Sequence, residues 1–152
     1  ANVYGPGQQL YRIISRTILY ILLGEKLQLH GGGISRRSFI HMDDVSDATL
    51  KIMLNGKNGD TYHISTDEVV SIRQLVETLC SKLGANFEDH AEIVGDRLGK
   101  DAAYQLDSTK LRTELKWQDN ISLDRGLDQC INWVKCNFDT LKNEPFNYIH
   151  KR

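Results

Sequence analysis

The sequence predicts a single α/β domain of the mixed (α+β) kind over residues 1–152, and three observations support this prediction. The length is typical of one domain, and a domain of this size buries a sizeable core. Several segments repeat apolar residues at three- and four-residue steps, the period of an amphipathic helix. Short runs bounded by turn-forming residues lie between them and are typical of strands. Roughly five strands and five helices result, a mixture typical of this fold class.

The first elements follow from glycine positions and helical periodicity. The chain opens in a strand that ends in the Gly-Pro-Gly turn at residues 5–7. A short strand is expected within 26–33, ending in a glycine turn, and another spans 36–44. Between the first two strands a helix is expected over 8–24, stopped by Gly24, with inward positions at Leu10, Ile13, Ile14, Thr17, Ile18, Ile21 and Leu22.

The middle of the chain predicts two capped helices and a strand. Either Asp43 or Asp44 can cap a helix over 44–56, whose apolar positions cover more than one face. A compact strand is expected at 59–66. Ser71 then caps a helix over 72–84, and Gln74 in its first turn completes a capping box. The buried stripe of that helix is Ile72, Leu75, Val76, Leu79 and Leu83.

The last third predicts two strands and two helices. The strands lie near 91–95 and 102–107 and are joined by a glycine-containing loop. A short capped helix is expected at 107–117, and a final helix spans 122–142 before the tail. The final helix is expected to bury Leu123, Leu127, Ile131, Trp133 or Val134, and Phe138.

Composition excludes several function classes. The net charge of -1 gives no sign of a nucleic-acid partner or of a charged membrane surface. The longest apolar run is far shorter than a bilayer span, and no signal segment opens the chain. Three cysteines without paired spacing indicate reduced thiols, no zinc site and a cytoplasmic location. Because the chain starts at Ala1 within an expected strand, we expect a fragment.

The stretch from Gly5 to Leu10 approaches the dinucleotide-binding pattern G-x-G-x-x-G but lacks its third glycine, which allows the helix to pack closely on the strand. Glu25 precedes the next apolar run, so it cannot end the second strand as the ribose-binding acid does. Pro6 also restricts the backbone where the phosphate turn needs freedom. The stretch is therefore not expected to bind a cofactor.

Two further motifs have simpler explanations than catalysis. The sequence His-Gly-Gly-Gly at 30–33 occurs in the oxyanion hole of some lipases, but no G-x-S-x-G nucleophile motif accompanies it, so a hairpin turn is expected. His41, Asp43 and Asp44 have metal-binding side chains, but no second cluster lies nearby in the sequence to complete a site. Helix capping accounts for the aspartates, and no metal is expected.

Cationic residues in two glycine-containing loops are more informative. Arg36 and Arg37 follow one loop, while Arg97 and Lys100 lie in the other. If these loops converge, their guanidinium groups match the oxygens of a diphosphate. Solvated surface charges are the alternative, and composition alone leaves both interpretations open.

In order along the chain, "NVYGPGQQ", "LHGGGISRRSFIHMDDVSDAT", "GDTYHIST", "SIRQLVETLC", "GDRLGKDAAYQLDSTKLRTELKW" and "GLDQCINWVK" resemble the C-terminal part of nucleotide-sugar 4,6-dehydratases. This group belongs to the extended short-chain dehydrogenase/reductases, and its dTDP-glucose type is the most similar. The resemblance covers essentially all 152 residues. Its most specific marks are the N-x-Y-G-P turn, the stretch from Arg37 to Val45 and the D-R-x-G-x-D loop from Asp96.

The resemblance implies a substrate-binding half and assigns roles to several residues. It places Asn2 near the sugar or phosphates, Tyr11 and Arg12 on the helix at the pocket entrance, and Arg37 and Arg97 at the diphosphate. The G-P-G turn would then face the substrate, not a cofactor.

Four positions depart from the family pattern. Ser71 and Lys100 stand where relatives often carry asparagine and histidine, and both remain substrate-binding candidates. Leu98 and Ser15 stand where prolines are usual, so loop and helix geometry is expected to differ locally.

The N-terminal Rossmann part of the family has no counterpart in these residues. No G-x-x-G-x-x-G loop and no Tyr-x-x-x-Lys pair occurs, although family members use NAD and need an acid or base beside it. We therefore expect no catalytic residue and no cofactor in this chain. The strands matching "SFIHM" and "TYHIS" would lack neighbours, which favours a homo-oligomer or an N-terminal Rossmann partner.

Two functions remain open at this point. The chain is either a separated substrate-binding half, inactive alone and weakly binding a nucleoside-diphosphate sugar, or a non-catalytic homo-oligomeric scaffold or binding module derived from such a half. An in-frame Rossmann half upstream in the coding sequence would favour the first.

Overall fold

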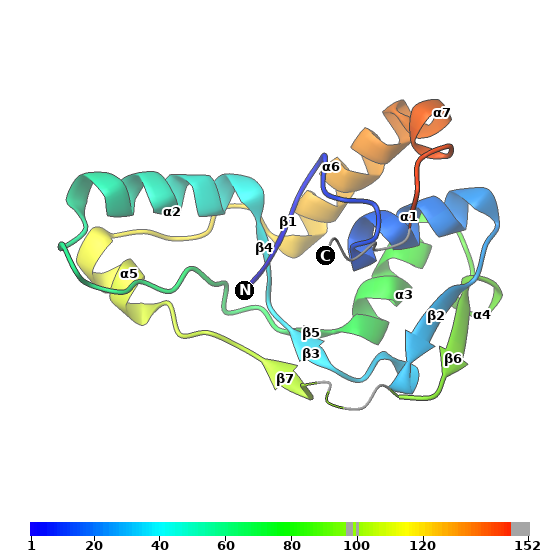
Figure 1. Ribbon diagram of the computed structural model, residues 1–152, viewed down its shortest axis with the longest axis horizontal. Helices are drawn as coiled ribbons and strands as arrows, with labels where there is room; N and C mark the ends of the chain where they lie inside the picture. Colours follow the sequence, from blue (N-terminus) through cyan, green and yellow to red (C-terminus); the bar gives the residue numbers. More distant parts are fainter. Residues whose placement is uncertain (97–98, 100, 147–152) are drawn as a thin grey trace, which may run out of the picture.

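The computed structural model describes residues 1–96, 99 and 101–146, as mixed helices and strands (Figure 1). The strands are β1 (Asn2–Tyr4), β2 (Leu27–His30), β3 (Arg36–Arg37), β4 (Phe39–His41), β5 (Val70–Ser71), β6 (Ala91–Val94) and β7 (Ala103–Tyr104). The helices are α1 (Ile13–Leu23), α2 (Met42–Asn55), α3 (Ile72–Leu83), α4 (Phe87–His90), α5 (Thr109–Leu115), α6 (Leu123–Cys136) and α7 (Phe138–Leu141), with a 3-10 turn at Gly31–Gly33.

The strands of the described residues form three small sheets. β1 and β4 pair in parallel, with Asn2 opposite Phe39 and Tyr4 opposite His41. β2 and β6 also pair in parallel, and β3 lies between β5 and β7. Parallel partners require a crossover connection, and α1 lies in the segment between β1 and β4. The mixed α/β class predicted from the sequence is confirmed.

The core divides between the two ends of an elongated molecule. At one end, α1, α3 and α6 bury a large cluster that includes Ile18, Leu79 and Leu127 (Figure 1). At the other end, α2 and α5 enclose Ala48 and Leu111 with Trp117. The pair β1–β4 runs between these ends, as Figure 1 shows, so it links both parts of the core.

Several local predictions are confirmed. Ser71 Oγ accepts a hydrogen bond from Gln74 N at 3.0 Å, and Ser71 N donates to Gln74 Oε1 at 2.9 Å, which completes the capping box of α3. Gly24 ends α1 in the left-handed conformation, with a φ of 72°. These motifs involve residues close in sequence, so the sequence alone determines them.

The hairpin turn predicted at residues 30–33 is wrong. β2 and β3 do not pair with each other, because β2 pairs with β6, more than sixty residues later in the chain. The three glycines form a 3-10 turn, all with positive φ. A Cβ on Gly33 would lie 2.9 Å from Arg73 N, so this turn also needs glycine for its close approach to α3.

The expected caps of α2 are also wrong. His41 is the N-cap, and its Nδ1 accepts from Asp43 N at 3.2 Å. Asp44 is buried and instead accepts hydrogen bonds from Asn120 N at 2.9 Å and Ile121 N at 3.0 Å. Asp44 therefore ties α2 to a segment 76 residues later, a contact that no local pattern indicates.

Other predicted elements also differ from the structure. α1 begins at Ile13, not residue 8, because residues 10–12 form a turn. The segment at 59–66 belongs to no strand ladder, since none of the described strands pairs with it. The final helix is interrupted at Asn137, whose Nδ2 donates to Trp133 O at 2.8 Å, so α6 and α7 are separate. The helix α4 was not predicted.

Candidate functional site

The turn after β1, the start of α1 and the strands β3 and β4 surround a cavity of about 1020 Å³. Four of the residues predicted from the sequence line it, although they come from three separate segments. They are Asn2, Tyr11, Arg12 and Arg37. We call this space the main cavity.

The G-P-G turn forms one wall of the main cavity. A Cβ on Gly5 would lie 2.6 Å from Met42 Cγ, and Gly7 has a φ of 81°, so both positions favour glycine. Gln8 Nε2 donates to Val3 O at 2.6 Å, which closes the turn onto β1. The turn therefore shapes a wall of the cavity.

Arg12 lies at the N-terminus of α1 and is exposed. Its guanidinium carbon is 5.4 Å from the centre of the Tyr11 ring. As the N-cap residue it provides no side-chain cap, so the first amides of α1 have no side-chain acceptor at that position. Positive charge and the helix N-terminus together favour an anion at this end of the cavity.

Arg37 approaches the cavity from β3 in a fixed orientation. Its Nη2 donates to Asp101 O at 2.9 Å, and its Nη1 donates to Arg36 O at 2.7 Å. Successive side chains on a strand point to opposite faces, and Arg36, unlike Arg37, does not line the cavity. The pair of arginines predicted from the sequence thus contributes one residue to this site.

Asn2 occupies the β1 side of the same cavity. Its backbone N–H donates to Ser38 O at 2.9 Å, which fixes the strand register, while its side-chain Nδ2 lies 3.5 Å from that oxygen. Because the side-chain contact is long, the carboxamide is available to a ligand.

Arg16 was missed by the sequence analysis and also lines the main cavity. It lies four residues after Arg12, so the helical period places both on one side of α1. Its Nη2 donates to Phe146 O at 2.7 Å, and its guanidinium carbon lies 5.7 Å from the Tyr20 ring centre. The i, i+4 spacing of two arginines was the available signal.

A second cavity of about 220 Å³ shares Tyr11, Ile13 and Arg16 with the main cavity. Its remaining walls come from β2, the glycine turn and the start of α3, namely Leu27, Gln28, Leu29, His30, Gly33 and Ile72. We call it the side cavity. The two cavities therefore have a common wall. The main cavity is rich in cationic side chains, and the side cavity is rich in apolar side chains.

One of the other predicted site residues lies away from both cavities, and two are not described by the structure. Ser71 lines neither of them, and its hydroxyl caps α3. Arg97 and Lys100 lie outside the described residues, so their positions remain predictions.

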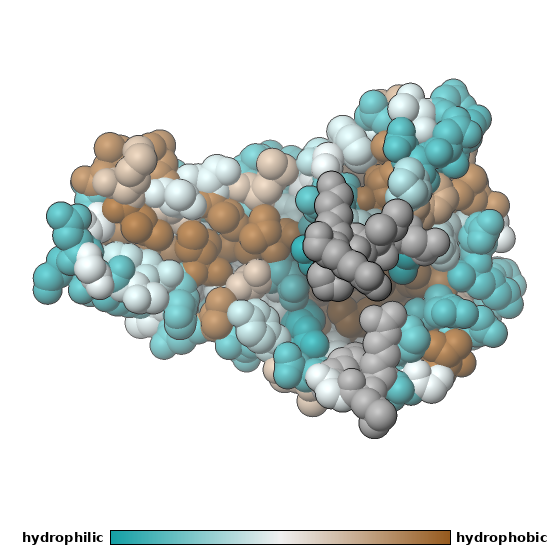
Figure 2. Space-filling view, viewed as in Figure 1, coloured by the Kyte–Doolittle hydropathy of each residue, from teal (hydrophilic) through white to brown (hydrophobic). Residues whose placement is uncertain are grey.

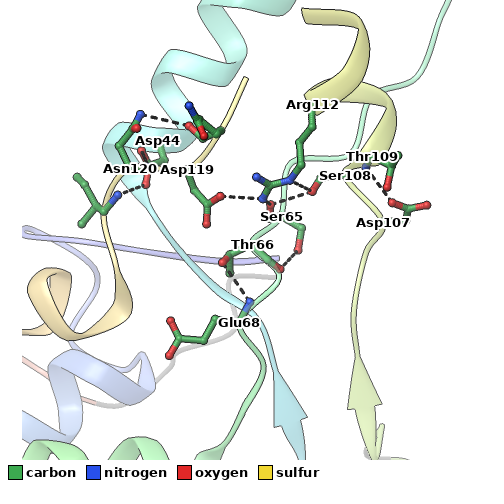
Figure 3. Close-up of polar contacts among 12 residues, drawn as sticks. Asp44, Ser65, Thr66, Glu68, Asp107, Ser108, Thr109, Arg112, Asp119 and Asn120 are labelled. Carbon is green, nitrogen blue, oxygen red and sulfur yellow. Dashed lines mark hydrogen bonds and ion pairs between the residues drawn. The ribbon is translucent and has the colours of Figure 1, made fainter. Parts of the chain in front are cut away.

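A separate polar network surrounds Arg112 (Figure 3). Arg112 Nη2 contacts Asp119 Oδ1 at 2.7 Å and donates to Ser65 O at 3.0 Å, while Nε donates to Ser108 Oγ at 3.0 Å. Burial tends to raise the pKa of Asp119, but hydrogen bonds with Thr66 and Arg112 outweigh burial and lower it. Because its members bond to one another, we interpret this network as structural.

Within the described part of the chain, no group of three or more His, Cys, Asp or Glu side chains is placed to hold a metal ion. In the same part, no helix is both long and apolar enough to cross a membrane.

Comparison with known proteins gives consistent matches. The family model for GDP-mannose 4,6 dehydratase matches residues 1–130. The chain is 30% identical to the dTDP-D-glucose 4,6-dehydratase of Mus musculus, with 96% of this chain and 44% of the mouse protein covered. It is 32% identical to the dTDP-glucose 4,6-dehydratase of Streptomyces niveus, with 90% and 40% covered.

Solved structures of similar proteins have the same fold. A dTDP-glucose 4,6-dehydratase from Streptomyces venezuelae, determined with NAD and TDP bound, superposes with a TM-score of 0.87 at 31% identity. A UDP-glucose 4-epimerase from Thermotoga maritima, determined with UDP-glucose, superposes at 0.84 and 28% identity. Each comparison covers 91% of this chain but 43% and 45% of those proteins. The chain therefore spans less than half the length of its relatives.

Proposed function

The chain belongs to the GDP-mannose 4,6-dehydratase family, and from this premise we propose that it is the sugar-nucleotide-binding portion of an NDP-sugar 4,6-dehydratase of the dTDP-glucose type. The observation that carries the proposal is the main cavity, where Asn2, Tyr11, Arg12 and Arg37 converge from separate segments. The relatives suggest the substrate class, since dTDP-glucose 4,6-dehydratases and a UDP-glucose 4-epimerase are both similar to this chain.

The diphosphate is proposed to lie between Arg12 and Arg37, at the N-terminus of α1. Guanidinium groups donate two parallel hydrogen bonds to phosphate oxygens, and each charge-assisted bond contributes about 1.5–3 kcal/mol when water is excluded. Arg12 is exposed in the described structure, so solvent screens its contact and the contribution falls well below that range. We therefore expect weak binding, with a dissociation constant on the order of a millimolar.

The nucleobase is proposed to occupy the side cavity, and the sugar the β1 side of the main cavity. The side cavity combines Leu27, Leu29 and the Tyr11 ring with the polar groups of Gln28 and His30, which suits a flat base with polar edges. Asn2 and Gln8 provide carboxamides for sugar hydroxyls on the opposite side.

Turnover is proposed to require a second, NAD-binding half. Dehydration of this kind uses hydride transfer to a nicotinamide held beside the sugar, and the sequence contains neither the glycine-rich loop nor the Tyr-x-x-x-Lys pair for it. The role of this chain is then to bind and orient the sugar nucleotide. We also propose a cytoplasmic location, because all three cysteines are free thiols.

Titration with dTDP, followed by NMR amide shifts, tests the proposed site. We expect shifts at Arg12 and Arg37, and Arg37→Ala should weaken binding several-fold. Arg125→Ala is the matched control, because Arg125 is an exposed arginine of α6 that lines neither cavity. Equal effects of the two substitutions, or shifts confined to residues outside both cavities, would refute the assignment.

A further inference from the structure

The segment that follows α7 runs back toward α1 (Figure 1). Residues 142–145 of this segment are exposed, and Figure 2 shows largely hydrophilic surface in this region, at the upper right of the view. Phe146 is half-buried instead, and it packs against the large apolar cluster that α1, α3 and α6 enclose. Phe146 therefore anchors the C-terminal segment next to α1, the helix that borders both cavities.

Phe146 contacts two residues that lie one turn apart on α1. Its backbone O accepts a hydrogen bond from Arg16 Nη2 at 2.7 Å, and its ring packs edge-on against the Tyr20 ring, with 6.3 Å between the ring centres. The Tyr20 ring in turn lies 5.7 Å from the guanidinium carbon of Arg16. The Arg16 guanidinium is thus held by a carbonyl of the C-terminal segment and by an aromatic ring that the same segment supports.

The position of Arg16 gives this contact a meaning for the candidate site. Arg16 lines both the main and the side cavity, whereas Phe146 lines neither. A guanidinium carries five N–H donors, and the bond to the Phe146 carbonyl uses one of them. This bond therefore fixes the guanidinium at the wall between the cavities without engaging the whole donor fork.

A guanidinium that is already held binds an anion at a lower entropic cost. A long side chain loses rotamer freedom when a ligand immobilises it, and this loss weakens binding. For Arg16, the contacts with Phe146 and Tyr20 impose most of that loss when the chain folds. A phosphate that reaches the shared wall then meets an oriented donor group.

We propose that Phe146 is a positioning residue, which holds the Arg16 guanidinium in place for the diphosphate of a bound nucleotide. The inference rests on the proposed function and adds to it a dependence of ligand affinity on a segment that lines neither cavity. Docking of the C-terminal segment on α1 and binding of a nucleoside diphosphate then favour each other.

NMR titrations of the full chain with dTDP and with thymidine test this role. Phe146→Ala should weaken dTDP binding by about two- to fivefold and leave thymidine binding unchanged, whereas Phe146→Tyr, which keeps the ring, should bind dTDP normally. Tyr20→Leu removes the second support of Arg16 and should act in the same direction as Phe146→Ala. In an Arg16→Ala background, Phe146→Ala should have no further effect.

Phe138→Ala is the matched control. Phe138 is also a half-buried phenylalanine near the C-terminal end, and it packs against the same apolar cluster but lines neither cavity. Its substitution should leave dTDP binding unchanged. Circular dichroism of each variant verifies that it is folded.

Several outcomes would overturn the inference. They are equal effects of Phe146→Ala and Phe138→Ala, a parallel loss of thymidine affinity, and an undiminished effect of Phe146→Ala in the Arg16→Ala background. Tighter dTDP binding by Phe146→Ala would also overturn it, because the carbonyl would then compete with phosphate for Arg16. If Arg37→Ala weakens dTDP binding and Phe146→Ala does not, the positioning role alone fails. If neither substitution has an effect, the proposed ligand site fails as well.

Discussion

The phenol ring of Tyr4 in β1 lies directly against Gly126 of α6, with no room for a side chain between them. A Cβ at position 126 would come within 3.0 Å of the Tyr4 ring and hydroxyl. The hydroxyl donates to Leu123 O at 3.4 Å, and burial raises the Tyr4 pKa. Since Gly5 follows Tyr4 directly, this contact fixes the turn that forms one wall of the main cavity.

Gly126→Ala should destabilise the protein by about 1–2 kcal/mol. Overpacking a filled site costs about 1–3 kcal/mol, while replacing glycine by alanine inside a helix recovers up to about 1 kcal/mol. Urea unfolding measures the net change. Because the nearest atom is the Tyr4 hydroxyl, Tyr4→Phe should relieve part of the clash, so the double variant should be more stable than the two single effects predict. Strict additivity would show that the two residues do not compete for space.

Asp44→Ala should lower the free energy of unfolding by about 3 kcal/mol. The Asp44 carboxylate is buried and accepts from two backbone N–H groups, which the substitution leaves without that acceptor. Asp43→Ala is the control, because the Asp43 side chain is 68% exposed and contributes a helix-dipole effect of up to about 1 kcal/mol and a 3.5 Å contact with His41 Nδ1. Chemical denaturation measures the free energy of unfolding of both variants. Similar losses of stability in the two variants would contradict the role assigned to Asp44.

These two aspartates show which features of the fold the sequence predicts. The capping box of Ser71 and Gln74 and the stop at Gly24 were correctly predicted, because each depends on residues a few positions apart. The sequence equally allowed Asp43 or Asp44 to cap α2. His41 caps α2 instead, because the Asp44 carboxylate accepts hydrogen bonds from the backbone N–H groups of residues 120 and 121. Hydrogen bonds between residues so far apart in the chain leave no local pattern in the sequence.

The strand pairings could not be predicted from the sequence for the same reason. The glycines after His30 favour a tight turn, and the hairpin prediction assumed that adjacent strands pair. β2 pairs instead with β6, whose residues lie more than sixty positions later. In the site, the family resemblance indicates Asn2, Arg12 and Arg37, whereas only the position of Arg16 on the wall of both cavities identifies it as a site residue.

The Asp119 carboxylate should make stability depend on pH on the acid side. Its pKa in the folded state is lowered from 3.8, so the ionised form stabilises the fold above the unfolded pKa, and this contribution is lost as pH falls through the folded pKa. In the Asp119→Asn variant, the side chain at this position cannot ionise. The stability difference between the two proteins should therefore be constant near neutral pH and shrink as the pH falls below about 4. A difference that grows in acid would reverse the sign of this argument.

The chain alone should show no dehydratase turnover with NAD and dTDP-glucose. It has no glycine-rich cofactor loop and no Tyr-x-x-x-Lys pair to move a proton beside a nicotinamide. The absorbance of the keto-sugar product in alkali measures turnover, with the intact dehydratase of a relative as the positive control. Detectable product from the pure chain would disprove this expectation.

Arg16→Ala should weaken dTDP binding by about three- to tenfold, because Arg16 lies on the wall shared by the main and side cavities. A diphosphate that links a base in one cavity to a sugar in the other passes this wall. Binding of thymidine, which carries no phosphate, should be unaffected by the same substitution. Arg16→Lys keeps the charge but loses the paired donors, so we expect an intermediate affinity. Arg16 also bonds to Phe146 O, and if that structural bond were its only role, dTDP and thymidine affinities would fall together.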